Sequence, residues 1–340
     1  MDLIIARPGL VVPLPAGAAG GPGPTHGQAR GPRWRRVSKG FYVPTDVSAD
    51  STEQRIVEAV AGLPAGALVT GWAALHWQGA RYLSGREAAR QLPVPVAVGD
   101  RRFLSRRPGV EIGFDWLFDD DAKELDGLPI TSAARSISWA ARRARSLLEA
   151  VTVVDMAAVD DLVSLDEMWH YATRLSGRPG IVRLRAALRA ADENTWSPME
   201  TLARLRWASS GLPRPRTNVP IFDEAGRHVA TPDLLDPAAG VAGEYDGRVH
   251  DTEQVRRRDH GAEDHLRDLG LEVVRLNSGR PDDVEAFTRR LHAAYERAAR
   301  RPAQSRWTTR RPAWWVDTSS VAARRALTPA QRSRWLRWRS

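Results

Sequence analysis

The sequence predicts an α/β protein of the α+β type, in which a helix-rich regulator-like domain precedes a C-terminal mixed β-sheet flanked by helices. Two observations carry this prediction. Helical periodicity runs from Ser132 to about Ala190, and from Ser197 onward the chain alternates between helix and strand patterns. A mixed sheet covered by helices is the architecture that such an order favours. The 340 residues, 42% of them hydrophobic, supply apolar material for two or three domains.

The N-terminal half begins with a segment that is unlikely to pack by itself. Residues 13–32 are rich in Gly, Pro and Ala, so that residues 1–32 are expected to form a flexible lead-in to a domain spanning 33–195. Residues 33–44 favour a short hairpin that turns around Ser38-Lys39-Gly40. The next expected elements are helices at 51–61, capped by Ser51 or Thr52, and at 71–78, and strands at 92–98 and 109–117.

The C-terminal domain is expected to span residues 196–299 and to be followed by a tail, 300–340. Its elements are predicted as a helix (198–209), strands (217–222, 228–236 and 241–246), a helix (252–269), a strand (271–276) and a helix (282–299).

Three carboxylates are expected to share one face of a hairpin in this domain. The run DPAAG, which begins at Asp236, has the composition of a tight turn. A four-residue loop pairs Asp236 with Val241. Three residues away from the turn on each strand, the same register places Asp233 opposite Glu244. Directly opposed residues have Cβ atoms about 4.5–5.5 Å apart. Asp246 lies two residues beyond Glu244 and therefore on the same face.

These carboxylates indicate a cation site. Clustered acids are unfavourable without a cation, and oxygen ligands suit Mg²⁺ or Mn²⁺. The candidate catalytic residues are Asp233, Glu244, Asp246 and His250, with His250 as a proton acceptor or an outer ligand. In the alternative interpretation, a one-residue slip turns Asp233 to the other face and leaves an ordinary polar hairpin.

Glu200 is a further acid, for which the local pattern predicts a structural role. The run SPME from Ser197 matches a capping box, in which Ser197 caps the helix and Glu200 reaches back to the cap amide.

The positive charge is concentrated in the tail. Residues 300–340 hold eleven arginines and one acid, Asp317, and so carry +10, whereas the whole chain carries +9. The tail also holds five of the thirteen tryptophans. Arginine pairs with phosphate and indole stacks on bases, which indicates nucleic-acid binding. The alternative is a tail whose tryptophans pack against the protein itself.

Composition excludes several classes. There is no cysteine, so disulfides and cysteine-ligated metals are impossible. No apolar run approaches the roughly 18 residues of a membrane span, and the first residues lack the pattern of a signal peptide. A cytoplasmic protein without a membrane partner is expected.

Five motifs that occur in order between about 196 and 296 carry a family resemblance. They are SPxE from Ser197, PD ending at Asp233, EYDGxxH from Glu244, RRRD from Arg256 and LGLEVVR from Leu269. The segment resembles PD-(D/E)XK nuclease-like domains related to very-short-patch-repair endonucleases.

This resemblance implies a restriction-endonuclease-like fold and Mg²⁺- or Mn²⁺-dependent hydrolysis of DNA phosphodiester bonds by an endonuclease. Asp233 and Glu244 match metal-binding acids of the family, and Glu200 matches the acid on the first helix, which adds a possible metal contact to its capping role. Asp246 stands where the typical enzyme has lysine.

A second resemblance covers about residues 25–190. It rests on RWRRVSKGFYVP from Arg33, VTGWAALHWQGA from Val69, GLPITSAARSISWAA from Gly127 and RPGIVRLRAALRAAD from Arg178. These runs are similar to AbiEi-like antitoxins or transcriptional regulators of type IV toxin–antitoxin systems. That similarity implies a winged helix whose wing would be residues 33–44, a toxin partner, and an alternative function as a non-catalytic DNA-binding regulator.

Basic and aromatic residues from three segments are the candidate DNA contacts, although solvated surfaces would explain the first two segments equally well. They are Arg33, Arg35 and Arg36 of the hairpin, Arg256 and Arg257 of the RRRD run, and Arg310, Arg311 and Trp314 of the tail.

Overall fold

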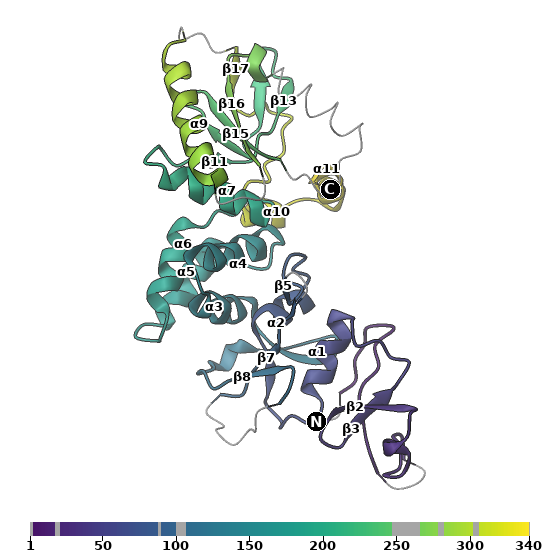
Figure 1. Ribbon diagram of the computed structural model, residues 1–340. Helices are drawn as coiled ribbons and strands as arrows, with labels where there is room; N and C mark the ends of the chain where they lie inside the picture. Colours follow the sequence, from purple (N-terminus) through teal and green to yellow (C-terminus); the bar gives the residue numbers. More distant parts are fainter. Residues whose placement is uncertain are drawn as a thin grey trace. The chain divides into compact units, whose positions relative to one another are not determined.

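The chain forms two compact units that each combine helices with β-sheets (Figure 1), which confirms the predicted α+β class. One unit comprises Met1–Arg145 and Asp166–Ala186, and the other comprises Ser146–Leu165 and Ala187–Ser340. The computed structural model describes residues 3–17, 21–87, 90–99, 107–246, 266–277, 282–301 and 306–339.

The first unit opens with a three-stranded antiparallel sheet. The predicted hairpin is confirmed as β2 (Trp34–Ser38) and β3 (Phe41–Pro44), with Gly40 at φ 82° in the turn between them. A positive φ is accessible to glycine because it has no Cβ. β1 (Leu14–Pro15), from the lead-in, pairs with β3.

A five-stranded sheet forms the centre of the first unit, in the order β8-β7-β4-β10-β9. Its strands are β4 (Leu68–Val69), β7 (Val94–Ala97), β8 (Val110–Gly113), β9 (Ala122–Leu125) and β10 (Leu128–Thr131). The helices α1 (Thr52–Val60) and α2 (Gly71–Trp77) pack their apolar faces against this sheet. Of the two candidate caps for α1, Ser51 is the N-cap, and its side chain accepts a hydrogen bond from the Gln54 amide. A small two-stranded sheet joins β5 (Arg86–Glu87) to β6 (Arg90–Gln91).

The predicted helix-rich stretch is confirmed. It consists of α3 (Ala133–Arg143), α4 (Leu147–Val159), α5 (Leu165–Arg174) and α6 (Ile181–Ala190). The interruption expected near 177–180 precedes α6. Gly180 has φ 78°, and a Cβ there would lie 2.5 Å from the Arg142 carbonyl oxygen, so the close approach of the two segments requires glycine.

A four-stranded mixed sheet forms the centre of the second unit, in the order β11-β14-β15-β16. The strands are β11 (Arg216–Thr217), β14 (Leu234–Asp236), β15 (Val241–Asp246) and β16 (Glu272–Asn277), and only β15 and β16 are parallel. One face packs against α7 (Pro198–Ser209) and α9 (Asp282–Ala299) through Trp207, Phe287 and Leu291. The other face carries a separate apolar cluster that includes Leu235 and Ala242.

The prediction of continuous strands at 217–222 and 228–236 was wrong. Asn218 has φ 47°, which breaks the first strand and sends β12 (Ile221–Asp223) into a second sheet. There it pairs with β13 (His228–Ala230). Residues 231–233 separate β13 from β14, and they include Pro232, which has no amide hydrogen for a ladder. Most of the helix expected at 252–269 lies outside the described residues.

The tail packs as part of the second unit. β17 (Trp307–Thr308) pairs with β12, and the helices α10 (Val321–Arg325) and α11 (Pro329–Arg339) follow. Arg324 is fully buried, and its Nε lies 2.7 Å from Asp161 Oδ1. The same guanidinium donates to the Ala158 and Glu193 carbonyl oxygens at 2.7 and 3.1 Å. Arg324 thus fixes this segment of the tail to the rest of the second unit.

A buried ion pair links α4 to α7 in the second unit. Asp155 is completely buried and accepts hydrogen bonds from Arg204 Nη2 (2.5 Å), the Thr201 hydroxyl (2.8 Å) and the Asp192 amide (2.8 Å). Burial raises the pKa of Asp155 to about 6, and the neighbouring charge of Arg204 opposes that rise. Two donors from α7 and one backbone amide from the segment before it thus converge on one carboxylate.

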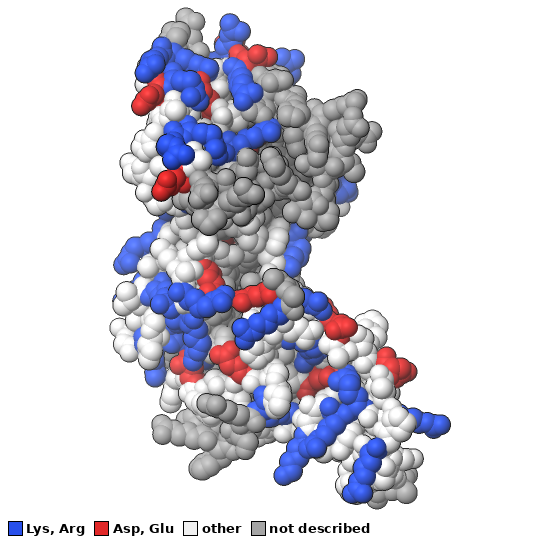
Figure 2. Space-filling model, in the orientation of Figure 1, with Lys and Arg blue, Asp and Glu red and all other residues white. Residues whose placement is uncertain are grey.

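Charged side chains cover the described surface unevenly. On the face drawn in Figure 2, the first unit shows Asp and Glu interspersed among Lys and Arg. Within the described parts of the chain, no helix combines the length and the apolar character needed to span a membrane.

Candidate functional site

The acidic hairpin has the register that the turn composition predicts. Asp236 pairs with Val241, and Leu234 pairs with Gly243. Asp233 is the residue just before β14, and its Oδ2 accepts a hydrogen bond from the Tyr245 amide at 2.8 Å. The Asp233 carboxylate therefore reaches the part of β15 that contains Glu244.

The two faces of β15 are distinguished by their contacts. Ala242 belongs to the apolar cluster away from α7, whereas a Cβ on Gly243 would lie 2.8 Å from the Trp207 ring of α7. Alternation along the strand therefore puts Glu244 on the Ala242 face, and its side chain is 25% exposed. Asp246 is paired in the backbone with Asn277, but its side chain lies outside the described atoms.

Arg275 is a site residue that the sequence reasoning did not anticipate. In the parallel ladder it lies beside Glu244, with 4.0 Å between Arg275 Nε and Glu244 Oε2. The signal present in the sequence was an arginine between the apolar residues Val274 and Leu276. The sequence alone does not say that β15 and β16 are neighbours, so the pairing was not available from it.

Glu200 lies in the first turn of α7, as predicted, but it accepts from the Trp196 amide rather than from the predicted Ser197 amide. Ser197 caps α7 and accepts from the Glu200 amide, while Glu200 Oε2 accepts from the Trp196 amide at 2.8 Å and from Asn218 Nδ2 at 2.7 Å. Burial raises the pKa of this carboxyl, and its hydrogen bonds with Trp196, Asn218 and the Ser197 side chain oppose that effect. The backbone amide of Asn218 donates to the Asp233 carbonyl oxygen at 3.0 Å, so Asn218 connects Glu200 to the start of β14.

The metal-ligating potential of the site rests on Asp233 and Glu244. Among the residues that the structure describes, no three His, Asp or Glu side chains form a group able to hold a metal ion. Of the candidate residues, His250, Arg256 and Arg257 lie outside the described residues. The hairpin brings the Asp233 carboxylate to the Tyr245 amide, next to Glu244 in the strand, and Arg275 supplies a positive charge beside Glu244.

A basic cavity of about 310 Å³ lies in the same unit. Arg214, Arg216 and Arg311 line it together with Asn218, the residue that bonds Glu200. Arg214 donates to the carbonyl oxygens of residues 189–191 at the end of α6, and burial lowers its pKa. Asp192 also lines the hollow and Arg311 pairs with Asp317, so the lining is net basic but partly neutralised.

The arginines predicted to contact DNA occupy different environments. Arg33 and Arg36 are exposed on the hairpin, whereas Arg35 makes a two-pronged ion pair with Glu58 at 2.7 and 2.9 Å. In the tail, Arg310 is exposed and Arg311 pairs with Asp317. The ion pairs make Arg35 and Arg311 less available to phosphate than Arg33, Arg36 and Arg310.

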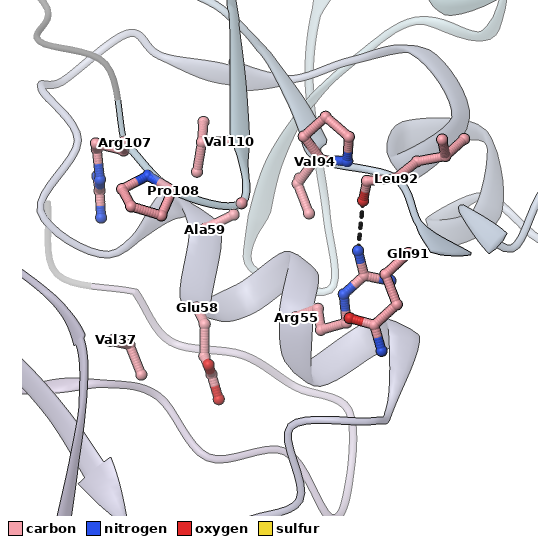
Figure 3. A pocket seen from close by; sticks show the side chains of 12 residues that line it. Val37, Arg55, Glu58, Ala59, Gln91, Leu92, Val94, Arg107, Pro108 and Val110 are labelled. Carbon is pink, nitrogen blue, oxygen red and sulfur yellow. Dashed lines mark hydrogen bonds between the residues drawn. The ribbon is translucent and has the colours of Figure 1, made fainter. Parts of the chain in front are cut away.

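A second cavity, of about 320 Å³, lies in the first unit (Figure 3). Arg55 donates to the Leu92 carbonyl oxygen at 2.5 Å, and Arg107 donates to the Ala61 carbonyl oxygen at 2.8 Å. Figure 3 shows apolar side chains, including Ala59, between the two guanidinium groups. Burial lowers the pKa of both arginines, and the Glu58 carboxylate lines the same cavity.

Acid should weaken the packing of the tail on β13. His228 stacks on Trp315 with ring centroids 5.0 Å apart, and burial lowers its pKa below the ordinary 6.5. The unfolded chain therefore binds a proton more readily, and stability should fall as the pH drops below about 6.5. Urea unfolding at pH 7.5 and 5.5 measures the loss, which His228→Gln should reduce. An equal pH dependence in both proteins would contradict this role for His228.

Comparison with known proteins gives no match: no family model, curated protein or solved structure is significantly similar to this chain.

Proposed function

We propose that the second unit is a restriction-endonuclease-like domain that hydrolyses DNA phosphodiester bonds with Mg²⁺ or Mn²⁺. One observation carries the proposal: the hairpin register brings the Asp233 carboxylate to the segment of β15 that contains Glu244. A divalent cation is bound well by carboxylate oxygens, and two acids at the open end of a hairpin could share one. The ordered family motifs support the same function.

The residues present fit a hard cation in their chemistry. Asp233 and Glu244 offer carboxylate oxygens, whereas Glu200 Oε2 already accepts from the Trp196 amide and Asn218 Nδ2. Asp233 and Glu244 would hold the ion, and Glu200 would support the site through its bond to Asn218. When bound, the ion would polarise the phosphodiester and make the attacking water more acidic.

Several neighbouring groups have supporting roles in this proposal. Arg275 lies where it can orient Glu244 and stabilise negative charge. In the typical enzyme of the family, the lysine at the position of Asp246 would serve that role. Asp246 and His250 would orient the water or accept its proton. The basic cavity of Arg214, Arg216 and Arg311 offers a place for a neighbouring phosphate of the DNA.

A second candidate function is a non-catalytic DNA-binding regulator or antitoxin that has a toxin partner. A specific observation favours it: Asp233 is satisfied by a backbone amide and Glu244 lies beside Arg275, so both acids are accommodated without a metal. In this case the fold would serve as a binding platform.

Cleavage and metal binding separate the two functions. The full-length protein is incubated with plasmid and single-stranded DNA in Mg²⁺, Mn²⁺ or EDTA, and binding of Mn²⁺ is measured by calorimetry. The nuclease predicts saturable metal binding and cleavage that EDTA abolishes. Metal-independent DNA binding without cleavage in either ion would contradict the nuclease and support the platform.

A further inference from the structure

Tryptophan side chains of the tail enclose a small pocket in the second unit, here called the tryptophan pocket. Its volume is about 230 Å³. It is lined by Trp314, Trp315, Val316, Thr318, Gln331, Arg334 and Trp335.

The inner walls of the pocket are held by the protein. Trp335 is only 6% exposed, and the buried Arg324 guanidinium lies 5.6 Å from its ring centroid. Trp315 is fixed by the stacked His228 ring and by an edge contact with Phe222 at 5.1 Å. These walls therefore have a set geometry before any ligand arrives, which lowers the entropic cost of binding.

The outer wall remains open to solvent. Trp314 contacts Phe222 and Trp315 edge-on at 5.9 and 5.6 Å, yet 59% of it is exposed. Val316 and Leu336 of the same tail are also exposed, with 39% and 46% of their surfaces accessible to solvent. Apolar surface gathered at a pocket, rather than scattered singly, is typical of a binding site.

The lining identifies the chemistry of the occupant. Arg334 is the charged residue of the lining, so a cationic ligand is disfavoured. An indole wall beside a guanidinium suits a flat ring that carries an anion, as a nucleobase with its phosphate does. The volume is below the roughly 300–1,000 Å³ of pockets for drug-sized ligands, which suits one base better than a larger body. The surrounding tail carries +10, which complements the charge of a nucleic-acid strand.

We propose that the tryptophan pocket binds one unstacked nucleobase of a DNA strand, while Arg334 contacts an adjacent phosphate. Bases in an intact duplex are stacked and paired, so entry requires a single-stranded or gapped segment. This inference rests on the proposed function in taking DNA as the ligand, and it specifies the form of DNA that is preferred.

Binding in EDTA tests the inference without any contribution from cleavage. Fluorescence anisotropy compares a labelled single strand, the same sequence as a duplex, and a strand of equal length made of abasic sites. The full-length protein should bind the single strand most tightly. Trp314→Ala should weaken that binding about 5- to 100-fold, whereas duplex binding should change little. Trp314→Phe should restore most of the affinity, because it keeps an aromatic face.

Trp116→Ala is the matched control. Trp116 is a 54% exposed tryptophan of the first unit, so its removal deletes a similar surface without touching the pocket. Both alanine variants should keep the thermal stability of the parent protein, because both side chains are largely exposed. The inference is overturned if Trp314→Ala binds the single strand as the parent does, or if it loses single strand and duplex equally.

The failure of this inference and that of the nuclease are distinguishable. A protein that binds single strands through Trp314 but never cleaves them retains the pocket and refutes the nuclease. A protein that cleaves DNA in Mg²⁺ with Trp314→Ala fully active and binding unchanged retains the nuclease and refutes the pocket.

Discussion

Glu244→Gln should abolish metal-dependent cleavage, with a loss of at least about 100-fold in rate. Glutamine keeps the size of the side chain but removes the charge that would hold the cation and, through it, stabilise the charge that develops on the phosphate. Removing a single group that stabilises such charge typically costs about 10²–10³ in rate. Because Glu244 is partly exposed at a strand end, the fold should tolerate the change. Rates are measured at saturating Mg²⁺ on single-stranded DNA, and Mn²⁺ binding is measured in parallel.

Glu285→Gln provides the control for this prediction. Glu285 is 86% exposed on α9 and pairs with Arg289 on the same helix, so the same chemical change there should leave the rate unaltered. Asp233→Asn should reproduce the loss seen with Glu244→Gln. If both hairpin variants cleave at the parental rate while remaining folded, the proposed site is wrong.

Asp155→Ala should destabilise the second unit by about 3–5 kcal/mol, because it leaves the buried Arg204 guanidinium without its carboxylate. The Thr201 hydroxyl and the Asp192 amide lose their acceptor in the same step. A loss of this size is a large part of the stability of an ordinary domain. Urea unfolding at pH 7, followed by circular dichroism, measures it.

A double variant separates the charge from the cavity. Asp155→Ala combined with Arg204→Met removes both charges, and it should be less destabilised than Asp155→Ala alone. Glu285→Ala, which breaks an exposed ion pair, should leave the unfolding curve almost unchanged. Equal destabilisation of the single and double variants would show that lost packing, rather than an unpaired charge, dominates.

Local patterns predicted the hairpin well because turn chemistry acts over a few residues. The run DPAAG closes on Gly240 at φ 69°, and this turn alone determines that Asp236 faces Val241. The caps of α1 and α7 were predictable for the same reason, since Ser51 and Ser197 bond amides three residues away. Interactions of this range are visible in a sequence.

Features that depend on distant residues were not predictable. The break at Asn218 requires side chains from elsewhere, because its Nδ2 donates to the Asn194 carbonyl oxygen and to Glu200. Arg275 joins the site only because β16 lies parallel to β15. The ion pair between Arg324 and Asp161 joins residues 163 positions apart in the sequence. Whether the tail packs against the protein therefore could not be predicted from the sequence.

The ion pairs within the tail limit the salt dependence of DNA binding. Eleven arginines in contact with phosphates would give a slope of log K against log salt of about −10 on duplex DNA and about −8 on a single strand. Five of the eleven already have carboxylate partners, namely Arg300, Arg301, Arg311, Arg324 and Arg332. Arginines held by carboxylates release fewer counterions on binding, so the measured slopes should be shallower than these limits. Part of the tail's positive charge thus serves ion pairs within the protein. The number of arginines in the tail therefore overstates the number of DNA phosphates that it can neutralise.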